Sequence, residues 1–383
     1  LFLYQNQLKN LSTMLTLNFS GYGIIRIYSY GLKEFVNTQT FDLSYNNLTI
    51  LNCKSFYGMV KLRRLNISFN QISKLEPEVF QDVPLLDNIN LNKNFIKHLD
   101  ENVFDDLQEL EFINLGSNQI ELLRKNTFKN LRRLGRLILN RNKLKSFEPI
   151  FLNLNSFHYI DVSSNEINNV HNDTFKSLLR IRTIHISMNQ ISIINSETFS
   201  GAGNLEKLHI RFNKLVRIDR KFSLNFPNLK ELDLSQNNLS FIEPDIFNGF
   251  VKMEVLRLND CNIKTIDLSP LENLKFLNLA RNEIRYFSQN LSNLSQLFLN
   301  SNPIFNLSYP LITSQNPSLE ELNIAYCNLQ YRKPSLFVYK LIIIGNPIIL
   351  NQDDFDGFRN LMKVHYGKFN TGITNISQAI EFL

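Results

Sequence analysis

The stretches "LNISFNQISKLEPEVF" at residues 65–80 and "LDLSQNNLSFIEPDIF" at residues 232–247 share one pattern of apolar residues, asparagine and phenylalanine. The interval from Asn70 to Asn237 divides into seven steps, six of 24 residues and one of 23, and each step ends on another asparagine. A fixed period of this length is typical of repeat architectures, in which each repeat is one small structural unit. The two stretches are therefore predicted to be the same unit, repeated along the chain.

Two ladders of residues define the period, and the template LxxLxLxxNxLxxLxxxxFxxL fits residues 62–83. The asparagine place is occupied at Asn46, Asn70, Asn94, Asn118, Asn142, Asn165, Asn189, Asn213, Asn237, Cys261, Asn282, Asn302, Cys327 and Asn346. The phenylalanine place is occupied at Phe56, Phe80, Phe104, Phe128, Phe151, Phe175, Phe199, Phe222 and Phe247. From Cys261 onward the steps become 21, 20, 25 and 19 residues, so the convex side is expected to change thickness there.

The residue types explain the fold. LxL is a short strand with two inward side chains, and neighbouring repeats place their strands about 4.8 Å apart in one parallel sheet. One repeat cannot bury its apolar side alone, so only the stack makes a continuous core. The turn after each strand buries backbone groups, and an asparagine amide, with two donors and an acceptor, can bond them from repeat to repeat. The phenylalanines are expected to fill the wider convex side.

The predicted fold class is an α/β solenoid, a horseshoe with a parallel β-sheet on the concave face and loops or short helices on the convex side. A single solenoid would cover residues 1–383, with irregular repeats at 1–37, regular 24-residue repeats at 38–260, shortened or irregular repeats at 261–350 and a degenerate terminal repeat at 351–383. Tyr22 falls at the ladder place of a loose early repeat. "LFLYQNQL" at 1–8 predicts an earlier strand, and Leu361, Val364 and Tyr366 predict a last one.

From residue 38 to about 350 the chain resembles an extracellular leucine-rich-repeat protein of the typical 24-residue class. Its mixture of regular and shortened repeats is similar to Toll-type receptor ectodomains and to insect leucine-rich immune proteins. The resemblance implies an extracellular location, either secreted or as the ectodomain of a membrane protein anchored by a segment not present here. Extracellular members usually carry cysteine-rich caps; "GNPIIL" at 345–350 resembles the start of one, but the cysteines that should follow are absent.

The three cysteines predict no disulfide framework. Cys261 and Cys327 occupy ladder places three steps apart, so they are expected to be buried thiols too distant to bridge. Cys53 falls at a variable convex position, where an intermolecular disulfide is the alternative to a free thiol.

Ten glycosylation sequons favour secretion. They are Asn10, Asn18, Asn47, Asn66, Asn172, Asn238, Asn290, Asn293, Asn306 and Asn375. Asn18 and Asn66 lie between strand residues on the concave face, so glycans there would obstruct the early repeats and favour a ligand at residues 136–212.

Composition and motifs exclude several classes of function. The formal charge of +6 and the pI of about 9.0 are modest for a nucleic-acid binder of 383 residues. The chain contains no run of 18 apolar residues, so the sequence predicts no membrane span. The chain contains no HExxH, P-loop, GxGxxG, GxSxG or CxxC motif, and its six histidines are scattered singly. The sequence therefore predicts no enzyme, no cofactor, no metal site and no nucleic-acid partner.

The predicted function is recognition of a protein ligand on the concave face, where rigid strands present arginine and aromatic side chains. The candidate partner-binding residues are Arg136, Arg141, Tyr159, Arg182, His185, Lys207, His209, Arg211 and Phe212. The alternative is an ordinary solvated polar face. His185 and His209 would be neighbours in one column, which raises the hypothesis of a pH-sensitive partner contact. A basic cluster, Arg124, Lys125, Lys129, Arg132 and Arg133, is expected to be a solvated rim rather than a phosphate site.

By resemblance, innate immunity is the first functional expectation, with immune proteins or another leucine-rich-repeat chain as partners. The alternatives are a cell-adhesion or developmental receptor ectodomain and, in a different class, an intracellular leucine-rich-repeat scaffold.

Overall fold

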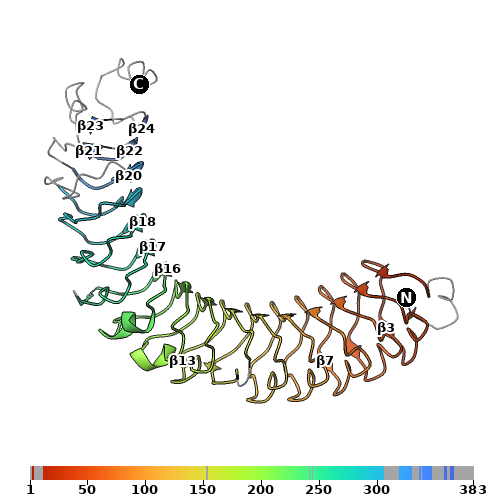
Figure 1. Cartoon of the computed structure of the whole chain (residues 1–383). Helices are drawn as coiled ribbons and strands as arrows, with labels where there is room; N and C mark the ends of the chain where they lie inside the picture. The colour runs from red at the N-terminus through yellow and green to blue at the C-terminus, as the bar shows by residue number, and fades with distance from the viewer. Residues whose placement is uncertain are drawn as a thin grey trace. The chain divides into compact units, whose positions relative to one another are not determined.

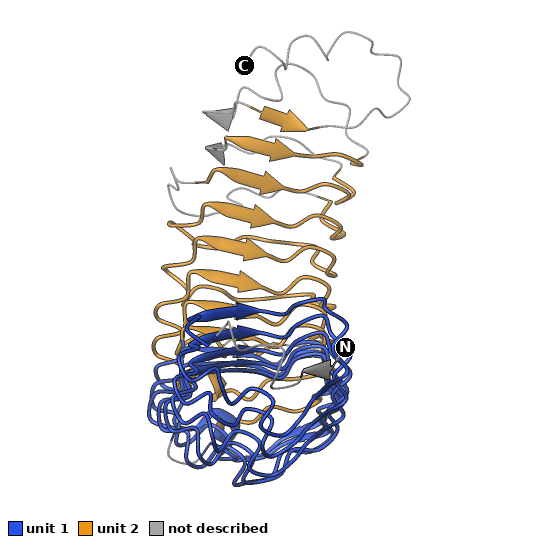
Figure 2. Cartoon of the chain, turned by 90° about the vertical axis from the view of Figure 1, so that its right-hand side faces the viewer, with its two compact units in different colours: residues 1–191, 197–205 blue, residues 192–196, 206–383 orange. Residues whose placement is uncertain are grey.

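The computed structural model describes residues 2–3, 12–151, 154–240, 242–243, 245–305, 319–329, 336–337, 339–346, 358–359 and 363–365. The chain divides into two compact units (Figure 2). Unit 1 comprises residues 1–191 and 197–205, and unit 2 comprises residues 192–196 and 206–383. Each unit is a run of solenoid turns, and each turn contributes one short strand to a parallel sheet.

Unit 1 contains eight strands of the main parallel sheet. They are β2 (Thr16–Asn18), β4 (Thr40–Asp42), β6 (Arg64–Asn66), β8 (Asn88–Asn90), β9 (Phe112–Asn114), β10 (Arg136–Ile138), β12 (Tyr159–Asp161) and β14 (Thr183–His185). The register repeats without a slip, so that Leu137 in β10 lies opposite Ile113 in β9 and Ile160 in β12. The middle residue of each of these strands is buried, as the LxL pattern predicts.

Unit 2 contains eight further strands, several of which follow one another in Figure 1. They are β15 (Lys207–His209), β16 (Glu231–Asp233), β17 (Val255–Arg257), β18 (Phe276–Asn278), β19 (Gln296–Phe298), β20 (Glu321–Asn323), β22 (Lys340–Ile342) and β24 (Lys363–His365). The shortened repeats keep the same register, because Leu256, Leu277 and Leu297 lie opposite one another in successive strands. The loss of residues per repeat therefore falls outside the strands.

Pairs of two-residue strands supplement the main sheet. They are β1 (Phe2–Leu3) with β3 (Arg26–Ile27), β5 (Ile50–Leu51) with β7 (Lys74–Leu75), β11 (Ser146–Phe147) with β13 (Asn169–Val170), and β21 (Leu336–Phe337) with β23 (Phe358–Arg359). The strand expected within residues 1–8 exists, but it pairs with β3 and not with the main sheet. The expected last strand is β24, which contains Val364 and pairs with β22; Leu361 and Tyr366 lie outside the described residues.

The asparagine ladder links successive turns as predicted. Asn70 donates from Nδ2 to the backbone oxygen of Leu43 at 2.9 Å in the preceding turn and to that of Ile67 at 3.2 Å in its own turn. Its Oδ1 accepts from the backbone nitrogen of Leu48 at 3.0 Å. The same three kinds of bond recur at Asn94, Asn118, Asn142, Asn165, Asn189 and Asn237. Each amide therefore satisfies backbone groups that the turn would otherwise bury without partners.

The turn that presents each ladder asparagine or cysteine requires a left-handed backbone. The residue before it has a φ between 52° and 58° at Tyr45, Phe69, Lys93, Ser117, Arg141, Ser164, Met188, Phe212, Gln236, Asp260, Arg281, Ser301 and Tyr326. Side chains at this place are accordingly turned outward, and Tyr45, Met188, Phe212 and Tyr326 are exposed. Before Asn346 the place is taken by Gly345, with a φ of 75°.

The two ladder cysteines make only some of the hydrogen bonds that a ladder asparagine makes. The Cys261 thiol donates to the backbone oxygen of Leu234 at 3.3 Å, and the Cys327 thiol donates to that of Leu299 at 3.1 Å. Both thiols are buried, and burial raises the pKa of Cys261 to about 12 and that of Cys327 to about 11. Cys53 is half-buried, and all three cysteines are free thiols.

The phenylalanine ladder is buried at every one of its nine predicted positions. Phe56, Phe80, Phe104 and Phe128 stack in sequence with ring centroids 6.0 to 6.1 Å apart and nearly parallel planes. The return segments are loops with two short 3-10 helices, η3 (Ser196–Phe199) and η4 (Phe222–Asn225), among the described residues. Tyr22 occupies the ladder place as predicted, since Leu17 lies opposite Phe41 in the register and Gly21 before it has a φ of 77°, but its side chain is 61% exposed and not buried.

Candidate functional site

The surface available for recognition is the sheet face, which we define as the outward first and third residues of each main-sheet strand. In β10 the pattern is exposed Arg136, buried Leu137 and half-buried Ile138. Parallel register then aligns equivalent residues of successive strands in columns, so that side chains distant in sequence become neighbours. The candidate partner-binding residues are distributed over both units, five in unit 1 and four in unit 2.

The centre of the unit 1 sheet face is an arginine between two aromatic rings. Arg136 lies opposite Phe112 on one side and Tyr159 on the other in the strand register. Its guanidinium carbon lies 5.6 Å from the Phe112 ring centroid and 4.8 Å from the Tyr159 ring centroid. Cation–π attraction of this kind holds a guanidinium in place without neutralising it. The Tyr159 ring in turn contacts the His185 ring, with centroids 5.5 Å apart.

Beside Arg136 the sheet face is hollowed. The hollow has a volume of about 590 Å³ and is lined by Asn88, Glu111, Phe112, Arg133, Gly135, Arg136, Ser156 and His158. Gly135 explains its presence, because this position in the turns on either side is Glu111 and His158. A Cβ on Gly135 would stand 2.6 Å from His158 Cε1, so the imidazole occupies part of the space that a side chain would take. His158 Nδ1 in turn lies 3.1 Å from the backbone oxygen of Ser156.

The other two unit 1 candidates flank the strands and do not belong to them. Arg141 follows β10 in the left-handed turn, with a φ of 54°, and is exposed. Arg182 directly precedes β14 and is also exposed. Tyr159 is half-buried, and burial together with the nearby charge of Asp161 raises its pKa, which Arg136 partly offsets. The phenol therefore stays protonated at neutral pH.

In unit 2 the candidates surround a carboxylate that the sequence did not single out. Glu231 in β16 lies 3.3 Å from Lys207 Nζ, 3.3 Å from His209 Nε2 and 2.6 Å from Arg257 Nη1. Burial acts to raise the pKa of Glu231, but hydrogen bonds from Arg257 and Lys207 and the nearby charges of His209 and Arg257 together lower it. Lys207 and Arg257 are therefore paired with Glu231, and His209 contacts the same carboxylate, which leaves less positive charge available on the surface than the sequence implied.

Arg257 extends this cluster into an aromatic row. Its guanidinium carbon lies 5.0 Å from the Phe276 ring centroid, and Phe276 packs against Phe298 with centroids 5.4 Å apart.

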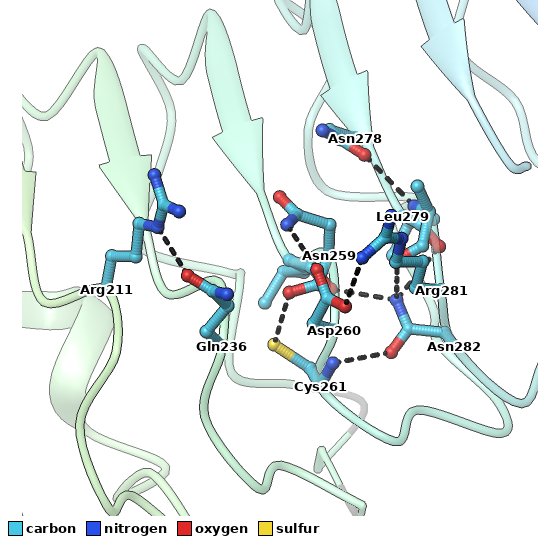
Figure 3. A network of polar contacts seen from close by, with 11 residues as sticks. Arg211, Gln236, Asn259, Asp260, Cys261, Asn278, Leu279, Arg281 and Asn282 are labelled. Carbon is cyan, nitrogen blue, oxygen red and sulfur yellow. Dashed lines mark hydrogen bonds and ion pairs between the residues drawn. The ribbon is translucent and has the colours of Figure 1, made fainter.

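Arg211 and Phe212, the last two candidates, follow strand β15 in the turn after its last residue, His209. Arg211 Nε donates to Gln236 Oε1 at 2.7 Å (Figure 3). Phe212 is 54% exposed in its left-handed turn. Further along this edge, Asp260 and Arg281 form an ion pair at 3.8 Å.

Phe112, Glu231 and Phe276 were not among the predicted site residues. All three are first residues of their strands, as the candidates Arg136, Tyr159 and Lys207 are, and reading every residue of that column would have found them. The hypothesis of a pH-sensitive contact at His185 and His209 did not include the acidic residue that faces one of them. The Glu231 carboxylate lies 3.3 Å from His209 Nε2, and it would attract this histidine when the imidazole is protonated.

The basic cluster at residues 124–133 is largely neutralised by acidic residues one turn earlier. Arg124 pairs with Glu101 at 3.6 Å, Lys129 pairs with Asp105 at 3.5 Å, and Arg133 pairs with Glu109 and Glu111. Such exposed pairs contribute little stability but cancel the local field. The cluster is a charge-balanced surface, in agreement with the expected solvated rim.

Six of the sequon asparagines are exposed, namely Asn18, Asn47, Asn172, Asn238, Asn290 and Asn293. Asn66 is half-buried, and its amide is engaged on both sides. Its Nδ2 donates to Asp42 Oδ2 at 3.1 Å, and its Oδ1 accepts from Ser68 Oγ at 2.7 Å. Asn10, Asn306 and Asn375 lie outside the described residues.

Within the described ranges, no group of three or more histidine, cysteine or acidic side chains is arranged to hold a metal ion. In the same residues no helix is long and apolar enough to cross a membrane.

Comparison with solved structures finds leucine-rich-repeat proteins over nearly the whole chain. The complex of TLR13 with ssRNA13 matches with a TM-score of 0.82 and 21% identity, covering 94% of this chain and 55% of that one. The Leptospira interrogans protein LIC12759 matches with a TM-score of 0.78 and 22% identity, covering 95% and 87%. The glycosylated Toll–Spatzle complex of Drosophila matches with a TM-score of 0.78 and 19% identity, covering 96% and 53%.

At these identities the matches establish the fold, and the chain spans about half the length of the TLR13 and Toll chains. A comparison with curated protein sequences finds no match. Models of the leucine-rich-repeat family match residues 32–72, 61–120, 155–213, 203–263 and 315–332. Because these segments make up more than half of the chain, and because the ladder residues join successive turns as the repeat requires, the chain belongs to the leucine-rich-repeat family.

Proposed function

We propose that the chain is a non-catalytic extracellular recognition module that binds a protein partner on its sheet face and acts in innate immunity. The observation that carries the proposal is the arrangement of Arg136 between Phe112 and Tyr159 on hydrogen-bonded parallel strands. Arginine and aromatic residues on a rigid surface are the usual components of a binding hot spot. Because register and stacking hold these side chains before binding, little conformational entropy is lost on association.

The likeness to the Toll–Spatzle complex, described as a hub in Drosophila development and innate immunity, supports both the immune proposal and its first alternative. That alternative is a cell-adhesion or developmental receptor ectodomain that uses the same sheet face. The two differ in where the partner is found: an immune binder should capture a soluble protein from body fluid, whereas an adhesion receptor should capture a cell-surface protein. Another leucine-rich-repeat chain is a possible partner in either case.

An intracellular scaffold is the second alternative, since the cysteines form no disulfide framework. Secretory expression, followed by mass spectrometry of the exposed sequons, distinguishes the intracellular scaffold from an extracellular protein. Occupied glycans at Asn47 and Asn172, with the protein remaining folded, support an extracellular location. A folded protein obtained only without glycans supports the scaffold.

The functional proposal is tested by capture with the immobilised chain from body fluid and from solubilised cell surfaces. Three proteins are compared: wild type, a sheet-face variant carrying Arg136→Ala and Tyr159→Ala, and a control variant carrying Arg124→Ala and Lys125→Ala. We expect partners that the wild type and the control retain equally and that the sheet-face variant loses. Partners retained equally by all three would contradict recognition through the unit 1 sheet face.

A further inference from the structure

Arg136 differs from the ion-paired cations of the unit 1 surface, namely Arg63, Lys54, Arg124, Lys129 and Arg133, each of which has an acidic partner within 4.0 Å. Among the described residues no carboxylate pairs with the Arg136 guanidinium, which lies between the Phe112 and Tyr159 rings and lines the adjoining hollow. An arginine side chain that is held in place but not neutralised has its charge available for a ligand.

The geometry limits how a ligand can reach that charge. The strand register places one aromatic ring on each side of Arg136 along the sheet, so approach from neighbouring strands is blocked. The adjoining hollow at Gly135 supplies space of about 590 Å³ beside the guanidinium. A group entering it meets the donors of Arg136 and the polar side chains of Asn88, Ser156 and His158.

We infer that this hollow is a binding site for a single carboxylate, the side chain of an aspartate or glutamate on an extended segment of a protein partner. The inference rests on the proposed function and names the chemistry of one subsite on the sheet face. A guanidinium presents parallel N–H donors that match the two oxygens of a carboxylate, and the bond is charge-assisted. The flanking rings hold the guanidinium in place before the carboxylate arrives, so little side-chain entropy is lost on binding.

A phosphate backbone fits the site less well than an isolated carboxylate. Glu111 lines the same hollow, and Glu109 lies close by in the ion pairs of Arg133. One carboxylate centred on Arg136 can avoid these acidic residues, whereas a continuous polyanion would have to pass them. The net charge of only +6 over the chain also provides little attraction for RNA.

The test uses the full chain and a phage-displayed library of random twelve-residue peptides. Peptides are selected on the wild type, and the tightest binder is synthesised with each acidic residue replaced in turn by its amide. Dissociation constants are then measured for wild type, for Arg136→Gln and for the matched control Arg64→Gln. Arg64 has the same first-strand position in β6, but its register neighbours are Thr40 and Asn88 and not aromatic rings.

We expect selected peptides to share one acidic position. Either Arg136→Gln or the amide at that position should weaken binding roughly 10- to 100-fold, and the two changes together should cost little more than either alone. Arg64→Gln should leave the affinity unchanged. Gly135→Ala should also weaken binding, because its Cβ would stand 2.6 Å from His158 Cε1 and force this ring, which lines the hollow, to move. Thermal unfolding checks that each variant is folded.

Peptides that bind equally well to Arg136→Gln, or that show no acidic preference, would overturn the carboxylate site. The broader proposal would still stand if capture of natural partners depended on the sheet face. Single-stranded RNA that binds the wild type with a steep salt dependence, and that Arg136→Gln releases, would assign the site to phosphate instead.

Discussion

The side-chain nitrogen of Asn70 donates a hydrogen bond to the backbone oxygen of Leu43, 27 residues earlier in the chain, at a distance of 2.9 Å. The same nitrogen bonds Ile67 within its own turn, so one amide fastens two turns of the solenoid. Repetition of this contact makes the stability of the chain depend on links between neighbours. In such an array, we expect the loss of one inter-turn hydrogen bond to destabilise its own repeat first and then the adjacent repeats.

The first prediction concerns one ladder amide. Asn94→Ala removes the bonds from its Nδ2 to Ile67 and Leu91 and the bond to its Oδ1 from the Ile72 nitrogen. Buried backbone groups are left without partners, so the free energy of unfolding should fall by about 2 to 4 kcal/mol. Denaturant unfolding measures the change. The exposed Asn168→Ala is the control and should change it by no more than about 0.5 kcal/mol; equal effects would mean that the ladder bonds are unimportant.

The second prediction is a stabilising substitution. Cys261 has no amide oxygen to accept from the backbone nitrogen of Leu239, the group equivalent to Leu48 beside Asn70. Cys261→Asn should restore that bond and raise the free energy of unfolding by about 1 kcal/mol. Cys261→Ala, which removes the thiol bond to Leu234 without replacing it, should lower it. A destabilised asparagine variant would show that the shortened repeat no longer accommodates the amide.

The third prediction concerns thiol reactivity. Cys261 and Cys327 are buried, and their pKa values are raised from 9.0 to about 12 and about 11. At pH 8 in the native state only the half-buried Cys53 should react with a small alkylating reagent, whereas all three should react after unfolding. Because the folded pKa values lie above the unfolded ones, the stabilisation is complete below pH 9 and declines as the pH rises toward 12. Rapid native labelling at Cys261 would contradict the burial.

The fourth prediction concerns the stacked phenylalanines. Phe104 lies between Phe80 and Phe128, with ring centroids 6.1 Å away on each side. Phe104→Ala should lower the free energy of unfolding by about 3 to 5 kcal/mol, because it opens a cavity that backbone on both sides prevents from collapsing. Hydrogen exchange should show lost protection in the turns next to Phe104 first. Phe104→Leu, which fills most of the space, should cost clearly less.

The fifth prediction concerns the charge cluster of unit 2. Glu231→Gln leaves Lys207, His209 and Arg257 without their shared counter-charge. We expect a loss of about 1 kcal/mol at pH 7, a small value because the cluster is partly solvated. The folded pKa of Glu231 lies below its ordinary 4.5, so its stabilisation is present above that pH and is lost as the pH falls through the folded pKa. The difference between wild type and variant should therefore shrink under acid conditions; a difference that persists at pH 2 would point to a packing defect.

The repeat could be predicted almost completely from the sequence because its physics is local and periodic. The apolar spacing, the asparagine and the phenylalanine each recur at a fixed interval, and the structure places all nine ladder phenylalanines in the core. At Tyr22 the register is as predicted, but the ring is exposed, because a phenol lacks the amide groups with which a ladder asparagine bonds the buried backbone. The early strand predicted within residues 1–8 was found, but its pairing with β3 was not predicted, because an apolar pattern does not specify the pairing partner.

The binding surface was predicted less completely because it depends on which side chains meet across the sheet. The nine candidate residues were chosen for their chemical type at sheet-facing or turn positions. Lys207 and His209 prove to contact Glu231, while Arg136 has rings beside it and, among the residues that the structure describes, no acidic partner. Residue type alone could not distinguish a cation that is paired with an acidic side chain from one whose charge is available to a ligand.

The sequence by itself determined the solenoid, its period, its buried ladders and the identity of its outward columns, because each follows from spacing within one or two repeats. Only the tertiary structure decided the electrostatic state of the sheet face, because charge and stacking depend on the distance between side chains on different strands. The hollow at Gly135 has the same origin: the absence of one side chain becomes a site only when Arg136, Glu111 and His158 stand around it.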